Sequence, residues 1–115
     1  MSIAKRIAAI TAERERKVIE VPEWGEGDNP LRLYSYPTTG RDMDKMGRKH
    51  PEFPLVRITW DAMIDFIIIK CQDEDGNQAF TLEDKPILKD QDNVVLARVF
   101  GEVYLSKSVE EHEKN

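Results

Sequence analysis

The sequence is poor in the residues that indicate export, redox chemistry or membrane insertion. Its 115 residues contain one cysteine, Cys71, so no disulfide can form within the chain and nothing indicates an oxidising compartment. We interpret Cys71 as a small buried hydrophobic residue. The longest purely apolar run, Phe66–Ile69, is far below the roughly 18 residues of a membrane span. The apolar run near Met1 is too short for a signal peptide, so we expect a cytoplasmic protein with no membrane partner.

Motifs for catalysis or for metal and cofactor binding are missing as well. His50 and His112 have no Cys or carboxylate at metal-ligand spacing, which predicts two surface histidines. The acidic turn Asp73–Asn77 does not match an EF-hand, because placing Gly76 at the sixth position puts Leu82 where a glutamate is needed. No phosphate-binding glycine loop and no nucleophile–base pattern is present. We therefore expect no catalytic residue, no metal, no cofactor and no enzymatic activity.

Basic residues are too few for a general nucleic-acid-binding protein. Lysine and arginine number 17 against 22 aspartates and glutamates, and the formal net charge is −5. One basic group could contact an acidic partner, but Glu13 and Glu15 dilute it. It consists of Lys5, Arg6, Arg14, Arg16 and Lys17. Three aromatic residues, Trp24, Tyr34 and Tyr36, could stack on single-stranded nucleic acid, although packing within a hairpin explains them more simply. We expect no nucleic-acid partner.

The residue patterns predict a small α+β domain with an N-terminal β-hairpin packed against several helices. A helix over Ile3–Arg16 is indicated by the Ser2 cap and by isoleucines at helical spacing, namely Ile3, Ile7 and Ile10. Strand formers over Val18–Trp24 and Leu31–Tyr36 flank a glycine-rich loop, which predicts a hairpin. Pro22 permits only an edge strand or a bulge.

The second half of the chain reads mainly as helix. Thr39 and Asp42 form a capping box that predicts a short helix over Gly40–Met46, ended by Gly47. A long helix is expected from Leu55 to about Ile68. Its predicted buried stripe contains Val56, Trp60, Met63, Ile67 and Cys71. The β-branched run Asp65–Lys70 leaves a strand as the alternative there.

Two further helices are expected towards the C-terminus. Thr81 caps a short helix through Glu83 and Asp84, and Pro86 either limits that helix or occupies its first turn. A final helix covers about Asn93–Leu105. The remaining residues form a charged tail. The chain therefore divides into a helix over 1–16, an α+β domain over 17–105 and a flexible tail over 106–115.

The surplus of apolar residues on the last two long helices has two interpretations. They either form the monomer core or provide an interface for a partner or for self-association. The candidate interface residues are Phe66, Ile68, Ile69, Leu96, Val99, Phe100, Val103 and Tyr104. Asp61 and Asp65, spaced i and i+4, could bind a cation, although a solvated stripe is the simpler interpretation.

The order of these features resembles the tail assembly chaperones of long-tailed bacteriophages, of the siphophage type. The resemblance covers roughly residues 17–104. It is carried by the strand Val18–Gly25, the capped helix start Thr38–Asp42, the acidic turn Asp75–Phe80 and the helix start Thr81–Asp84.

This resemblance implies a non-catalytic protein made in the host cytoplasm during infection and absent from the mature virion. Such chaperones coat the tape measure protein and recruit the tail tube protein. They often occur in two lengths through a translational frameshift, and Glu113–Asn115 could be encoded by a slip site. A structural tail or neck protein retained in the virion, or a small host adaptor protein, is the alternative.

Overall fold

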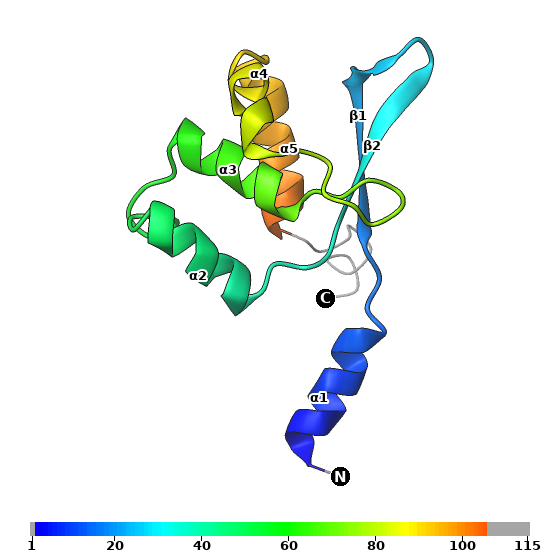
Figure 1. Ribbon diagram of the computed structural model, residues 1–115, viewed down its shortest axis with the longest axis vertical. Helices are drawn as coiled ribbons and strands as arrows, with labels where there is room; N and C mark the ends of the chain where they lie inside the picture. Colours follow the sequence, from blue (N-terminus) through cyan, green and yellow to red (C-terminus); the bar gives the residue numbers. More distant parts are fainter. Residues whose placement is uncertain (1, 106–115) are drawn as a thin grey trace.

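The computed structural model describes residues 2–105, so the expectations for the tail over 106–115, Glu113–Asn115 included, lie outside the described residues. Figure 1 shows a β-hairpin packed against helices, which confirms the α+β class. The elements in order are α1 (Ile3–Ala12), β1 (Lys17–Glu26), β2 (Asn29–Ser35), α2 (Gly40–Lys49), α3 (Trp60–Lys70), a 3₁₀ turn η1 (Leu82–Asp84), α4 (Lys85–Lys89) and α5 (Asn93–Leu105).

The hairpin follows the predicted alternation. β1 and β2 pair antiparallel from Lys17–Ser35 to Val21–Leu31, and the register then shifts before Glu26 pairs with Asn29. Pro22 lies at the start of this irregular stretch, as expected of a residue that cannot donate to the ladder. One face of the hairpin is buried, and it carries Ile19, Val21, Leu33 and Ser35.

The segment that follows α3 extends the hairpin locally. Gln72 exchanges two backbone hydrogen bonds with Tyr34 of β2, at 2.8 and 2.9 Å. Beyond it, the carboxylate of Asp73 accepts the backbone N–H groups of Asp75 and Asn77, and Gly76 adopts a positive φ of 88°. The acidic stretch is therefore the turn that the sequence predicted.

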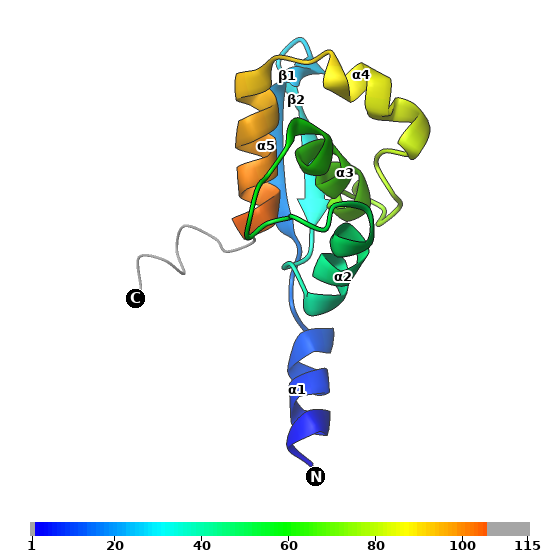
Figure 2. The same cartoon turned by 90° about the vertical axis from the view of Figure 1, so that its left-hand side faces the viewer.

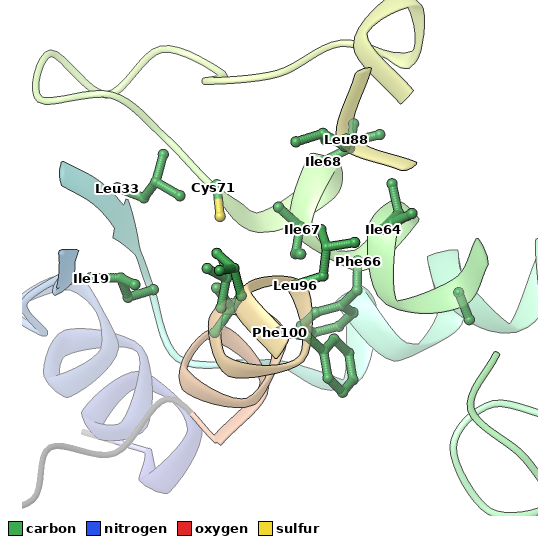
Figure 3. Close-up of a cluster of buried hydrophobic side chains, with 14 of the residues drawn as sticks. Ile19, Leu33, Ile64, Phe66, Ile67, Ile68, Cys71, Leu88, Leu96 and Phe100 are labelled. Carbon is green, nitrogen blue, oxygen red and sulfur yellow. The ribbon is translucent and has the colours of Figure 1, made fainter. Parts of the chain in front are cut away.

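Helix α3 lies at the centre of the core and is buried on most of its surface (Figure 3). Its apolar side chains meet α5, the inner face of the hairpin and Leu88 of α4. The strand alternative for Asp65–Lys70 is wrong. The helix, however, begins at Trp60, five residues later than predicted.

The late start of α3 has a local cause. The side chain of Thr59 caps the helix by accepting the N–H of Ala62 at 3.1 Å. Before it, the N–H groups of Val56 and Arg57 both bind the carbonyl oxygen of Glu52, which closes a turn. The prediction that Val56 and Trp60 belong to a buried helical stripe is therefore wrong, because Val56 precedes the helix and Trp60 is 45% exposed.

Two other helix boundaries differ from the prediction. Helix α2 has the predicted capping box, with Thr39 and Asp42 bonded reciprocally, but it runs through Gly47 to Lys49. His50 ends it as the C-cap, because its N–H binds the carbonyl oxygen of Met46 at 2.7 Å. The first helix ends at Ala12 rather than Arg16.

Helix α1 projects away from the rest of the molecule, as both views show (Figures 1 and 2). None of its residues is buried. Its three isoleucines, Ile3, Ile7 and Ile10, are 74%, 59% and 71% exposed. The amphipathic pattern of α1 is therefore not used to cover the core of this chain.

Candidate functional site

Most of the candidate interface residues lie inside the monomer. Phe66, Ile68, Leu96, Val99, Phe100 and Val103 are buried, and Tyr104 is half-buried. The aromatic members pack on one another, with the Phe66 and Phe100 rings at 5.7 Å and the Phe100 and Tyr104 rings at 5.4 Å. Ile69 alone is open to solvent, at 37%. The structure thus favours the core interpretation for seven of these eight residues.

One group of exposed apolar residues lies in the loop before α3 and at the first residue of that helix. Leu55 is 95% exposed, Val56 77%, Ile58 40% and Trp60 45%. We refer to these four residues as the apolar loop. Large apolar side chains gathered on a monomer's surface commonly mark a binding site. Helical spacing predicts Val56 and Trp60 on a buried stripe, and it gives no signal for Leu55 or Ile58 as surface residues.

The apolar loop is anchored at both ends. Phe53, immediately before it, is buried, and its ring packs on Phe66, Phe100 and Tyr104 at centroid distances of 5.8, 6.2 and 5.9 Å. At the far end, the Thr59 cap starts α3. An ion pair between Glu52 and Arg57, 3.3 Å apart, spans the turn between these anchors. The fold therefore presents the apolar side chains outwards.

Several basic residues precede this loop on α2, and one more, Arg57, lies within it. Helix α2 and the loop expose Arg41, Lys45, Arg48, Lys49 and Arg57. The acidic residues of the same stretch are partly neutralised, because Asp42 pairs with buried Lys70 at 2.7 Å and Glu52 pairs with Arg57. Two of the cations are paired as well, Lys49 with Asp65 and Arg57 with Glu52, and Asp44 of α2 is an exposed acidic residue, so apolar area is the main feature of this loop.

A buried carboxylate holds the helices that carry this surface. Asp65 of α3 is 2% exposed. Its Oδ2 atom lies 2.7 Å from His50 Nε2 and 3.1 Å from Lys49 Nζ, both at the end of α2. Lys85 Nζ, at the start of α4, lies 3.1 Å from Oδ1 and 3.2 Å from Oδ2. Asp65 therefore joins three helices through one side chain.

The electrostatics of Asp65 agree with this role. Burial alone would raise the pKa of Asp65, but hydrogen bonds from His50, Lys85 and Lys49 outweigh burial and hold the pKa below its usual value. Asp61, one turn earlier, pairs with Lys89 at 2.7 Å, and this bond lowers the Asp61 pKa. The two carboxylates are thus paired with protein cations. The interpretation of Asp65 as part of a solvated stripe is wrong, whereas His50 is half-buried and uses its ring to bind Asp65.

The aromatic residues of the hairpin and Tyr36 just after it contact other side chains of the chain. Trp24 packs edge-on against Phe80 at 6.3 Å. The Arg14 guanidinium lies over the Tyr36 ring at 5.2 Å, and that of Arg16 lies over Tyr34 at 4.6 Å. These contacts favour the hairpin-packing interpretation over a stacking platform for nucleic acid.

Cys71 behaves as the sequence predicted. It is 1% exposed, and burial raises the pKa of its thiol to about 12. It borders a pocket of about 340 Å³ that is also lined by Lys45, Ile69, Gln72 and Gln78. A thiol with so high a pKa carries almost no thiolate at neutral pH, so it is a poor nucleophile.

Within residues 2–105, no group of three or more His, Cys, Asp and Glu side chains is arranged to hold a metal ion. The helices of the same range lack the length and apolar character needed to cross a bilayer. Comparisons with protein-family models, with curated proteins and with solved structures give no match to this chain.

Proposed function

We propose that this protein is a non-catalytic tail assembly chaperone. In this proposal it binds the tape measure protein of a long-tailed phage in the host cytoplasm, helps recruit tail tube subunits and is left out of the virion. The observation that carries the proposal is the apolar loop, which is anchored and open to solvent. The resemblance in the order of elements supplies the identity of the partner.

The apolar loop suits the recognition of a long amphipathic helix. Such a helix offers an apolar stripe, and a chaperone covers that stripe with its own exposed apolar side chains. Trp60 is the natural anchor, because tryptophan contributes large contact area at interfaces.

The test is capture of the tape measure protein from cells that produce it together with this chain carrying an affinity tag. Leu55→Asp combined with Val56→Asp should lower recovery of the tape measure protein by at least about tenfold, which corresponds to about 1.4 kcal/mol. Both residues are more than three-quarters exposed, so the variant should keep its fold. Val94→Asp, at an apolar residue that is 70% exposed but lies on α5, is the matched control.

Capture of other proteins would favour one of the alternative functions. Capture of neck or capsid proteins without the tape measure protein would favour a structural tail or neck protein. Mass spectrometry of purified particles separates this case, since a chaperone is absent from the virion. Capture of host proteins alone would favour a host adaptor. Equal capture by the loop variant and by the Val94→Asp control would refute the apolar loop as the binding surface.

A further inference from the structure

Helix α1 carries an apolar stripe that its own chain does not cover. Ile3, Ile7 and Ile10 lie on one face at spacings of four and three residues, and they are 74%, 59% and 71% exposed. An isolated helix of about ten residues is marginal in water, because most helical stability in proteins comes from packing of an apolar face. The stripe therefore fits a partner surface from outside this chain.

The residues that follow α1 hold the helix away from the body of the same copy. The Arg14 guanidinium lies over the Tyr36 ring at 5.2 Å. Arg16 stacks on Tyr34 and donates hydrogen bonds to two backbone carbonyl oxygens of the acidic turn, both at 3.0 Å. Both views show α1 pointing away from the core (Figures 1 and 2). The isoleucine stripe is thus presented to solvent in a defined direction.

Two side chains of opposite charge lie on one flank of this stripe. Seven residues make nearly two helical turns, so Arg6 and Glu13 stand one above the other beside the isoleucines. Glu13 is the C-cap of α1 and keeps helical backbone angles, with φ at −95° and ψ at −3°, so its side chain continues that row. Both residues are exposed, and neither takes part in an ion pair in the part of the chain that the structure describes. Lys5 lies on the opposite face of the helix.

This pattern is self-complementary when two α1 helices pair antiparallel. The three isoleucines take the d, a and d positions of a heptad, which makes Arg6 and Glu13 successive g positions. A two-fold axis across the seam places the g flanks of antiparallel helices on the same side, so Arg6 of each helix faces Glu13 of the other. Parallel helices instead place the g flank beside the e flank, which holds the uncharged residues Ala4 and Thr11. Antiparallel pairing also sets the positive end of each helix dipole beside the negative end of the other.

We propose that two copies of this chain dimerise through antiparallel α1 helices, with Ile7 of each helix packed beside Ile10 of the other and with Arg6 of each copy paired to Glu13 of the other. The contact is symmetric, so it closes as a dimer. Two helices of 10 residues bury less than the about 1,200 Å² at which standard interfaces begin, so we expect a weak dimer. The apolar loop takes no part, so this inference goes beyond the proposed function and does not depend on it.

Disulfide trapping in the full chain tests the orientation of the helices. Cys71 is buried, with a thiol pKa of about 12, so it stays out of the reaction. Arg6→Cys and Glu13→Cys chains, distinguished by a mass tag on one of them, are mixed and oxidised in a glutathione buffer. The mixed disulfide should exceed either like disulfide at least about fivefold, because only the antiparallel pair brings positions 6 and 13 within bonding reach. An excess of like disulfides, or a mixed yield that Ile7→Asp in both chains does not lower, would overturn the proposal.

Sedimentation velocity up to about 500 μM measures the affinity. Wild type should form a dimer, and Ile7→Asp should raise the dissociation constant at least about tenfold. Ala8→Asp, which adds the same charge outside the stripe, is the matched control and should have little effect. Because α1 contributes no buried residue, both variants should keep the wild-type melting temperature.

Charge exchange tests the ion pairs. Arg6→Glu should weaken the dimer, because it sets two carboxylates against each other across the seam. Adding Glu13→Arg to the same chain should restore the dimer, because the charges are then exchanged. Monomeric wild type at about 500 μM, unchanged association of Ile7→Asp, or no recovery in the double variant would each overturn the proposal.

Discussion

Asp65 is the side chain on which the packing of α2, α3 and α4 most depends. Its carboxylate, 3% exposed, is the common acceptor for Lys49, His50 and Lys85. Asp65→Asn keeps the shape of the side chain and removes its charge. Breaking a buried ion pair costs about 3–5 kcal/mol. We expect about 3 kcal/mol, the lower end, because the Lys49 side chain is half exposed and remains hydrated.

Urea denaturation followed by circular dichroism measures this loss, because urea does not screen charges. With an m-value of about 1.5 kcal/mol/M, a loss of about 3 kcal/mol lowers the unfolding midpoint by about 2 M. Asp61→Asn is the matched control: it lies one turn earlier on α3, its side chain is 48% exposed, and it should lower the urea midpoint far less than Asp65→Asn does, because solvent screens its ion pair. Equal losses in the two variants would refute the role of Asp65.

The pH dependence gives a second check on Asp65. Its pKa is lowered in the folded chain, so its carboxylate stabilises the fold above the unfolded pKa of about 3.9. This contribution is lost as the pH falls through the folded pKa. The difference in unfolding free energy between wild type and Asp65→Asn should therefore be complete at pH 7 and shrink below about pH 4. A difference that stays constant to pH 2 would contradict this reasoning.

Two other predictions follow from single contacts. A Cβ added at Gly25 would lie 2.1 Å from the Asn29 carbonyl oxygen, so Gly25→Ala should lower the free energy of unfolding by at least about 2 kcal/mol. Gly40→Ala, which meets open space, should change it by less than about 1 kcal/mol, and equal urea midpoints for the two would contradict the clash. Cys71, buried and with a pKa of about 12, should react with a thiol reagent at least about a hundredfold more slowly in native protein than in urea. Rapid labelling without unfolding would show that its environment opens.

The sequence alone could not decide whether the apolar residues of α3 are buried within the monomer. The sequence indicated a helix with surplus apolar residues and left open whether Phe66 and Ile68 met the core or a partner. Both are buried, whereas Leu55 and Val56 in the preceding loop are exposed. Val56 and Trp60 share a helical spacing, but the chain before Thr59 forms a turn closed on the Glu52 carbonyl oxygen, and the helix begins only after the Thr59 cap.

What the sequence determined by itself is local. The bounds of α5, the hairpin, the Thr39–Asp42 capping box and the turn at Gly76 all follow from hydrogen bonds and backbone preferences within a few residues. Only the tertiary structure decided that Asp65 is buried, because its three partners come from 15 or more residues away in both directions along the chain. The tertiary structure also leaves the three isoleucines of α1 exposed, although their spacing is amphipathic. Burial depends on which distant segments pack together, and no short window of sequence contains that information.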